Sequence, residues 1–457
     1  MKHKKSTQNP DVVSRRRFMG TGSLAAGATA QLAINTSWAH SSSTDKPALL
    51  GGAPVKADAF PGWPVADAAD EQAVAEVLRS GKWGRGGGTK VLKFEQLFSQ
   101  TMAAKACLAT SSGTSALLVS LNALGIGPGD EVIVPPYTFV ATINVVLMCH
   151  ALPVFVDTHP DTFQIDASKI EAAITERTKA IIPVHLGGST FDVDAVQAVA
   201  RKHNLPIVED SCQSHLSEWR GKRTGSFGAL GCFSFQASKN LNSGEGGAIL
   251  SASDELIERC YTFHNNGRYR KQAGYDFAYA TRGLNLRMTE FQAGLLATQM
   301  TRLESQSQRR GQNGQYLTSL LREIPGLTPA KMHDGCTRNA YHLYMMRYDP
   351  QQFSGLPRDT FLKALEAEGI PASGGYYPLN KQPFLKSSFT SRGFQAVYSQ
   401  QRLAQWEDQN RTPVNDKLCN EAVWFTQNMM LGPRRDMDQI ADAVRKIHNH
   451  AGDLKKV

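Results

Sequence analysis

Residues 232–247 read CFSFQASKNLNSGEGG, a short apolar run followed by a turn rich in Ser, Asn and Gly that carries one lysine, Lys239. An amine held on a loop at the end of a strand is what Schiff-base catalysis with a carbonyl cofactor requires. The alternative is a surface lysine in a flexible loop, and for an isolated lysine that alternative is the better one. The sequence around Lys239 therefore has to decide between the two.

Seven short apolar runs, each bounded by turn residues, alternate with helix-like segments between residues 75 and 255. The runs are ACLATSS (106–112), EVIVPP (131–136), LPVFVD (152–157), KAIIPVH (179–185), LPIVED (205–210), LGCFSFQ (230–236) and GAILSA (247–252). This alternation predicts an α/β fold with one large, seven-stranded, mostly parallel sheet covered on both faces by helices. In such sheets ligands bind at the carboxyl ends of the strands, so the residues that follow each run are the informative ones.

Three strand ends carry residues that suit a cofactor. Ser111–Ser115 stands between a strand and a helix, where small residues let backbone N–H groups approach an anion, although an ordinary helix cap reads the same way. Phe139 follows the next strand and could stack on a planar ring, although an isolated Phe is more often core. Asp210 could pair with a protonated pyridine nitrogen, although an Asp there is more often a turn residue. Together with Lys239, these features are what a pyridoxal-phosphate (PLP) site needs.

The order and spacing of several motifs resemble the DegT/DnrJ/EryC1/StrS family, the sugar and cyclitol aminotransferases of PLP fold type I. The motifs are SSGTSAL, GDEVIVPPYTFVAT, VFVD, TKAIIPVH, VEDSCQSH, FSFQASKNLNSGEGG and GLNLRMTEFQAG. The resemblance runs from Ala48 to the C-terminal helix. It implies a homodimer with a shared active site, and a smaller α/β domain after the large one.

The resemblance also implies a role for each matching residue. Lys239 corresponds to the lysine that binds the cofactor covalently and then moves the substrate proton. Asp210 corresponds to the acid that holds the pyridinium N–H, Gln213 to a contact with the ring face or 3′-oxygen, and Phe139 to the aromatic side chain that stacks on the ring.

The cofactor phosphate has four expected ligands by the same resemblance. Gly113 and Thr114 correspond to backbone donors and Ser234 to a hydroxyl donor. Asn285 corresponds to an asparagine that reaches the phosphate from the partner subunit.

The sequence leaves the roles of several other polar residues open. His215 is either catalytic or a satisfied structural histidine, and Arg268 and Arg270 either hold a substrate anion or form a solvated face. Lys222 and Arg223 read as exposed loop charge. Tyr376 and Tyr377 stand where relatives often have a His-Tyr pair near the substrate pocket, and this departure puts the identity of the amino acceptor in doubt.

The N-terminal residues read as an export signal. Arg15, Arg16 and Arg17 precede an Ala/Gly-rich stretch too short and polar to span a bilayer, and Ser37–Ala39 has the form of a cleavage site. The stretch resembles a twin-arginine signal peptide, which implies export of the folded protein to the periplasm or the outside, with membrane contact only during export. A basic, disordered tail is the alternative.

The remaining composition excludes several classes of protein. The net charge is +9, but residues 1–39 supply six Lys/Arg against one acid, so no nucleic-acid partner is indicated. The seven cysteines are scattered and contain no CxxC pair, which indicates neither a metal site nor a disulfide framework.

The predicted organisation has four parts. Residues 1–39 form the signal peptide, 40–64 a linker and an N-terminal arm that packs on the large domain or its dimer partner, 65–304 the large PLP-binding domain, and 305–457 a connecting helix and the small domain.

The predicted function is ping-pong transamination from glutamate or glutamine to a keto-sugar or keto-cyclitol. PLP-dependent sugar dehydration is an alternative, but members of the family with that activity replace the lysine with histidine. A second alternative is an exported PLP-fold protein that binds a sugar without turnover, since amino donors and nucleotide sugars are scarce outside the cytoplasm. This last alternative gives no reason for having both Lys239 and Asp210.

Overall fold

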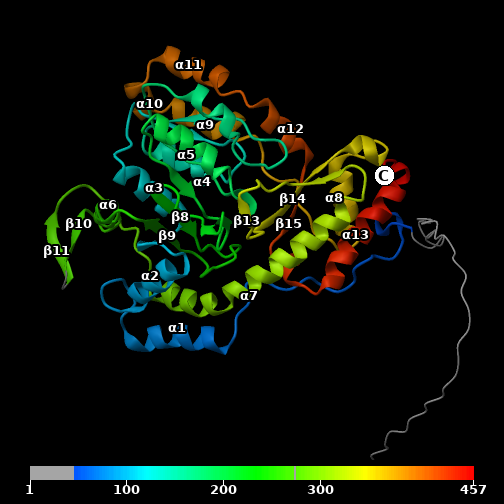
Figure 1. Cartoon of the computed structure of the whole chain (residues 1–457), viewed down its shortest axis with the longest axis horizontal. Coiled ribbons are helices and arrows are strands. Elements are labelled where there is room, and N and C mark those ends of the chain that lie inside the picture. The colour runs from blue at the N-terminus through cyan, green and yellow to red at the C-terminus, as the bar shows by residue number, and fades with distance from the viewer. Residues whose placement is uncertain (1–45, 272–273) are drawn as a thin grey trace, which may run out of the picture. The chain divides into compact units, whose positions relative to one another are not determined.

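Each of the seven apolar runs forms a strand in the computed structural model, which describes residues 46–271 and 274–457 (Figure 1). The strands are β1 (Ala106–Thr110), β2 (Glu131–Val134), β3 (Leu152–Phe155), β4 (Thr178–Ile181), β5 (Val208–Asp210), β8 (Leu230–Ser234) and β9 (Gly247–Ser251). Every residue of β2, β5, β8 and β9 is buried. Strands buried on both sides show continuous apolar runs, because no face alternates toward water.

The seven strands form two sheets where the sequence predicts one. The first has the order β1-β9-β8-β5 and the second the order β3-β2-β4, and β9 runs antiparallel to both of its neighbours. Only isolated parallel bridges, Ile181–Ile207 and Val184–Asp210, join β4 to β5. Pro183 and Pro206 lie in this stretch and have no N–H to donate, so a continuous ladder cannot form there. The prediction of a single seven-stranded sheet is corrected accordingly.

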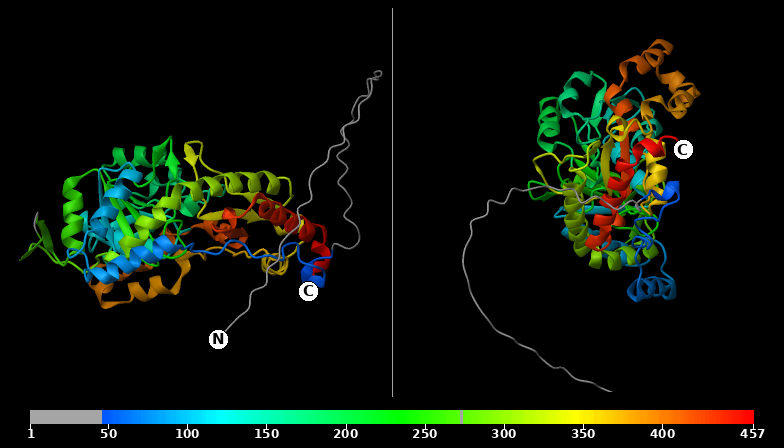
Figure 2. Two further views of the ribbon diagram at one scale, coloured as in Figure 1. Left: turned by 90° about the horizontal axis from the view of Figure 1, so that it is seen from below. Right: turned by 90° about the vertical axis from the view of Figure 1, so that its right-hand side faces the viewer.

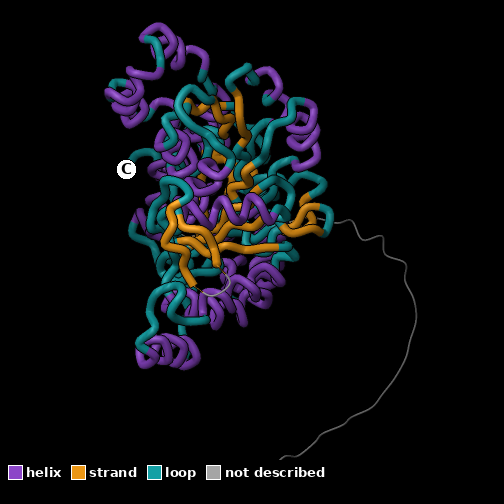
Figure 3. The backbone as a smooth tube through the Cα atoms, turned by 90° about the vertical axis from the view of Figure 1, so that its left-hand side faces the viewer, coloured by secondary structure: helices purple, strands orange, loops and turns teal. Residues whose placement is uncertain are grey.

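Helices cover both faces of the first sheet, and Figure 3 shows strands running between groups of helices. The helices around the two sheets are α2 (Lys90–Thr101), α3 (Gly113–Ala123), α4 (Ala141–Met148), α5 (Val193–Lys202), α6 (Asp254–His264) and α7 (Glu290–Leu321). Leu108 and Ile249 point toward α3 and α6, whereas their strand neighbours Ala109 and Leu250 pack with α2 and α7. The α5 helix packs with β4 and the second sheet.

A third sheet, with the order β12-β14-β15, forms the C-terminal part of the protein. Its elements are β12 (Leu327–Pro329), β14 (Leu343–Tyr348) and β15 (Ala422–Thr426), which pack with α8 (Arg358–Ala367), α13 (Arg434–Asn449) and α14 (Ala451–Leu454). The end of α7 contributes Leu317 and Leu321 to this core. The predicted connecting helix is thus the second half of α7, which runs unbroken through residues 304 and 305.

The remaining strands of the described residues form two small antiparallel sheets. The first consists of β6 (Glu218–Trp219), β7 (Lys222–Arg223) and β13 (Cys336–Arg338), and the second of β10 (Arg268–Lys271) and β11 (Gly274–Tyr279).

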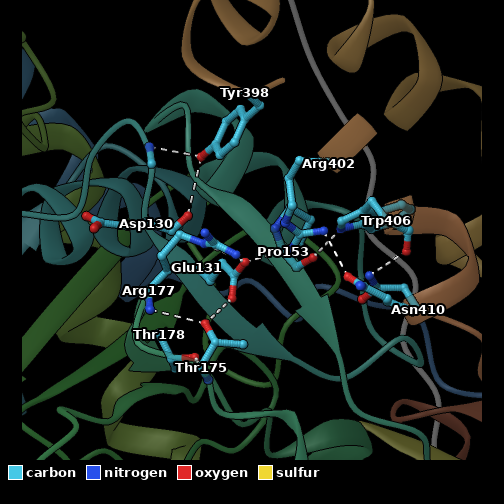
Figure 4. Close-up of polar contacts among 12 residues, drawn as sticks. Asp130, Glu131, Pro153, Thr175, Arg177, Thr178, Tyr398, Arg402, Trp406 and Asn410 are labelled. Carbon is cyan, nitrogen blue, oxygen red and sulfur yellow. Dashed lines mark hydrogen bonds and ion pairs between the residues drawn. The ribbon is translucent and has the colours of Figure 1, made fainter. Parts of the chain in front are cut away.

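Three short helices leave the C-terminal part and pack beside β2 and β3. They are α9 (Pro383–Phe389), α10 (Arg392–Val397) and α11 (Gln400–Gln409), and α12 (Pro413–Glu421) then leads back to β15. The carboxylate of Glu131 has no exposed surface and accepts from Arg402 at 2.6 Å and Thr175 at 2.6 Å (Figure 4). Trp406 Nε1 donates to the Pro153 carbonyl at 2.7 Å. These contacts hold α11 against β2 and β3.

The N-terminal arm, which precedes α1 (Ala68–Ser80) in the sequence, packs on the C-terminal part of its own chain (Figure 2). Glu368 accepts from the backbone N–H groups of Ala48 at 2.8 Å and Val55 at 2.9 Å, and buried Lys56 pairs with Asp436 of α13 at 3.0 Å. Most of the arm therefore packs on the C-terminal part and not on the large domain as predicted, although Trp63 at its end donates to the Ala237 carbonyl of the large domain. Packing on a dimer partner stays a prediction.

The predicted signal peptide, residues 1–39, lies outside the described residues. Within the described ranges, no helix combines the length and apolar character that crossing a membrane requires.

Candidate active site

Lys239 lies in the turn between β8 and β9, just past the carboxyl end of β8. Its backbone N–H donates to the Gln236 carbonyl at 2.8 Å, and its side chain is half-buried. Burial lowers the pKa of Lys239, an effect that nearby Cys212 and Asp210 partly oppose. A lowered pKa increases the neutral fraction of the amine, and the neutral amine is the form that attacks a carbonyl.

The side chain of Lys239 faces His342, which precedes β14. Nζ of Lys239 lies 3.4 Å from Nε2 of His342, and Nδ1 of His342 lies 3.2 Å from Oδ1 of Asn240. The Asn240 amide is oriented by donation from Nδ2 to the Ala340 carbonyl at 2.8 Å, so its oxygen faces the ring. The His342 proton therefore sits on Nδ1, and the bare Nε2 can accept a proton or hydrogen bond from Lys239.

Asp210 ends β5 and is buried. Its Oδ2 accepts from the hydroxyl of Thr142 at 2.8 Å, and its Oδ1 accepts from the backbone N–H of Cys212 at 3.2 Å. These two donors fix the orientation of the carboxylate, and a buried carboxylate held in this way suits a protonated ring nitrogen.

The predicted anion cup forms at the N-terminus of α3. Ser112 caps the helix by accepting from the N–H of Ser115 at 3.0 Å. A Cβ atom on Gly113 would lie 2.6 Å from Cβ of Ser234 and 2.9 Å from Sγ of Cys212, so only glycine lets Ser234 approach this helix terminus. Thr114 is exposed and Ser234 is buried at the end of β8. Free N–H groups, a hydroxyl and the helix dipole here suit a phosphate.

Gln213 and Phe139 lie at the same edge of the sheets. Gln213 is buried, and its Oε1 accepts from the N–H of Gly187 at 2.8 Å, while its Nε2 donates to the hydroxyl of Tyr376 at 3.1 Å. Phe139 precedes α4 and is 55% exposed, so its ring is available to a ligand. Tyr376 therefore belongs to the site, whereas Tyr377 is 74% exposed.

Asn285 is exposed and pairs with Asn265 in an isolated antiparallel bridge. The next residue, Leu286, accepts from the N–H of Ser111 in the anion cup. The contact of Asn285 with a partner's cofactor stays a prediction.

Three residues of the site were not predicted, namely Thr142, Asn240 and His342. His342 lies 103 positions after Lys239, within AYHLYMM, where the apolar pattern indicates only a strand. Asn240 lies in the Ser/Asn-rich turn around Lys239, but its contact with His342 is evident only from the three-dimensional structure.

Arg268 and Arg270 do not converge on Lys239. The Arg268 guanidinium lies over the ring of Tyr279 at 5.2 Å, and that of Arg270 lies over Tyr261 at 4.5 Å. Both stand on β10, in the hairpin at the left of Figure 1.

His215 and Arg223 are more buried than surface residues. His215 packs against Phe233 and Phe235, and burial lowers its pKa to about 3, so the ring is neutral near pH 7. Arg223 lies in β7 and pairs with Glu218 at 3.1 Å, so the interpretation of Arg223 as exposed loop charge is wrong. Lys222, beside it, is exposed.

Known proteins match this chain over most of its length. A model of the DegT/DnrJ/EryC1/StrS aminotransferase family matches residues 64–423. The L-glutamine:2-deoxy-scyllo-inosose aminotransferase of Streptoalloteichus tenebrarius is 37% identical over 429 residues, covering 89% of this chain and 99% of that protein. A protein of the same name from Streptomyces kanamyceticus is 36% identical over 422 residues, covering 89% and 98%. The crystal structure of 3-amino-5-hydroxybenzoic acid synthase has a TM-score of 0.75 at 29% identity, covering 86% and 99%.

The fold and the site thus define an α/β enzyme of the PLP-dependent aminotransferase class. The chain belongs to the DegT/DnrJ/EryC1/StrS aminotransferase family.

The residues present fit the PLP cofactor. The N-terminus of α3, which Ser234 can approach closely because residue 113 is glycine, is the cradle for its phosphate. The buried, oriented carboxylate of Asp210 suits its ring nitrogen. Lys239 supplies an amine of lowered pKa at the same edge. A phosphate cup, a ring-nitrogen acid and a reactive amine are the three groups that this cofactor needs.

Proposed function

We propose that this enzyme transfers an amino group from L-glutamine or L-glutamate to a keto-cyclitol of the scyllo-inosose type, or to a related keto-sugar, by a ping-pong mechanism. The observation that carries the proposal is the contact of the Lys239 amine with a neutral proton acceptor, His342, close enough to Asp210 for that carboxylate to oppose the lowering of the Lys239 pKa. The names of the two relatives support the choice of donor and acceptor, because each matches this chain over nearly its whole length.

Each residue of the site has its own role in the proposed reaction. PLP supplies an electron sink for the negative charge that develops at the donor Cα. Lys239 holds the cofactor, and when released it takes the proton from the donor Cα and later returns a proton to the acceptor carbon. Asp210 keeps the ring nitrogen protonated, and the cup of Gly113, Thr114 and Ser234 holds the phosphate. Phe139 and Gln213 orient the ring.

The site is shared across a homodimer in this proposal. Asn285 is exposed in the single chain, as a residue that contacts a partner's cofactor has to be. Size determination of the holoenzyme, together with Asn285→Ala, checks this: loss of cofactor affinity without loss of the dimer is the expected result.

Export by the twin-arginine route is part of the same proposal. It rests on the residues Ser14–Met19 and the small-residue cleavage pattern at Ser37–Ala39. Lys239 then acquires its cofactor in the cytoplasm and meets its substrate in the periplasm or outside. The full chain should accumulate outside the cytoplasm, and replacing both Arg15 and Arg16 with Lys should retain it inside.

A half-reaction experiment tests the proposed activity. The absorbance spectrum of the holoenzyme is followed while L-glutamine is added, and then, after removal of the donor, while scyllo-inosose is added. Conversion to the amine form and back is the expected result. A spectrum that no amino donor changes would contradict transamination and would favour a binding protein.

A further inference from the structure

Residues 373–378 run from the C-terminal sheet, where Ser373 pairs with β15, to Gln213 of the candidate active site. Ser373 exchanges two backbone hydrogen bonds with Trp424 of β15, at 3.1 and 2.9 Å. Arg358 then holds the next carbonyl, that of Gly374, at 3.0 Å. Five residues after Pro378 the chain enters α9, and Asn380 in between donates to the Asn410 carbonyl at 3.0 Å. The segment is thus fixed at both ends.

The middle of this segment is fixed as well. Gly375 adopts φ 85°, and a Cβ atom there would lie 2.6 Å from the hydroxyl oxygen of Tyr137. Such a close approach at positive φ requires glycine. Tyr376, the next residue, is therefore presented in one defined position.

The hydrogen bonds around Gln213 determine the direction of the Tyr376 hydroxyl. The backbone N–H of Gly187 can only donate, so the atom of Gln213 that faces it is Oε1. The other end of the amide, Nε2, must then donate to the hydroxyl oxygen of Tyr376, at 3.1 Å. Tyr376 consequently keeps its own proton for another acceptor, and the described residues provide none. Burial raises the pKa of Tyr376, so the proton stays on the hydroxyl over the working pH range.

The surroundings of this free donor suit a polyhydroxylated ring. The ring of Tyr376 meets that of Trp424 edge to face at 4.6 Å between centroids, and that of Tyr137 at 5.5 Å. Tyr137 is buried, so the half-buried rings of Tyr376 and Trp424 are the ones that can pack against the C–H faces of a cyclitol or sugar. The Tyr376 hydroxyl at their edge can bind one of its oxygens.

We propose that Tyr376 is a specificity-determining residue for the amino acceptor: it accepts a hydrogen bond from Gln213 and donates one to a keto or hydroxyl oxygen of the acceptor ring. The inference rests on the proposed function and adds the residue that recognises the amino acceptor.

The test compares Tyr376→Phe with Tyr377→Phe, a matched control that removes the same hydroxyl from the exposed neighbour. Both variants keep their rings, and their melting temperatures verify folding. For Tyr376→Phe the rate of the L-glutamine half-reaction should stay within about twofold, whereas kcat/KM for scyllo-inosose should fall about tenfold, as expected for one lost hydrogen bond. Tyr377→Phe should change neither.

A binding measurement separates this inference from the proposed function. Calorimetry with scyllo-inositol, which has no ketone to react, should show about tenfold weaker binding to the Tyr376→Phe holoenzyme than to the wild type or Tyr377→Phe. If the wild type binds the cyclitol in this way but transfers no amino group, the proposed function fails and the inference stands. Equal losses in both half-reactions, or a scyllo-inositol affinity that Tyr376→Phe does not change, would overturn the inference.

Discussion

Nζ of Lys239 lies 3.4 Å from Nε2 of His342, a residue on the other side of the connecting helix in sequence. The chain of hydrogen bonds from Ala340 through Asn240 leaves Nε2 without a proton. Burial also holds the pKa of His342 well below its ordinary value, so the ring stays neutral. His342 is thus built to accept from Lys239.

Replacing His342 with Phe should slow the L-glutamine half-reaction about tenfold, because Lys239 loses the acceptor that orients its amine. Stopped-flow absorbance measures this rate. His342→Gln offers an amide oxygen at a similar place and should recover part of it. A rate equal to that of the wild type in the Phe variant would show that the contact does not serve the reaction.

Gly113→Ala should weaken PLP binding about tenfold or more, because the new methyl group overlaps Ser234 and forces the cup open at a cost of about 1–3 kcal/mol. Titration of the apoenzyme by fluorescence measures the affinity. Gly311→Ala is the control, since nothing lies within 4 Å of a Cβ atom at that helical position. Equal affinities in the two variants would argue that the phosphate binds elsewhere.

The stability of the fold should decrease on acidification below about pH 6.5. Burial lowers the pKa of His215 and of His264 to about 3, whereas each has an ordinary value of 6.5 in the unfolded chain. Between these values the unfolded chain binds protons that the folded chain does not, so the free energy of unfolding rises with pH across this window. Each histidine contributes about 1.4 kcal/mol per pH unit.

Guanidinium unfolding at several values between pH 5 and 7 measures this slope. His264→Gln should reduce it by the equivalent of about one proton. A slope that the substitution leaves unchanged would mean that His264 is protonated in the folded state.

Glu131→Ala should lower the free energy of unfolding by about 3 kcal/mol, because it leaves Arg402 without its buried partner. Asp408→Ala removes an ion pair to Arg411 in which both side chains are exposed, and should cost less than about 1 kcal/mol. Denaturant unfolding of both variants gives the comparison. Similar losses would indicate that the helices α9–α11 are not held through Glu131.

The sequence predicted all seven strands of the central part, because strands buried on both faces leave uninterrupted apolar runs such as EVIV. It did not predict the break between β4 and β5, because Pro183 and Pro206 come to lie on neighbouring segments only after folding. In the site, Lys239 and Asp210 follow strands and could be found from position alone. His342 and Thr142 could not, because their signal is a contact between distant segments.

The sequence also did not predict where the N-terminal arm packs. Its Pro/Gly-rich composition indicates an extended segment, but its anchors, Glu368 and Asp436, lie more than 300 residues away. Long-range ion pairs of this kind leave no local pattern.

The most direct test of the central claim is to reduce the holoenzyme with borohydride and to map the cofactor by peptide mass spectrometry. We predict a single phosphopyridoxyl group on the peptide that contains Lys239, and none in the Lys239→Ala variant, which should also lose the L-glutamine half-reaction. Labelling of a different lysine, or full turnover without Lys239, would contradict the account.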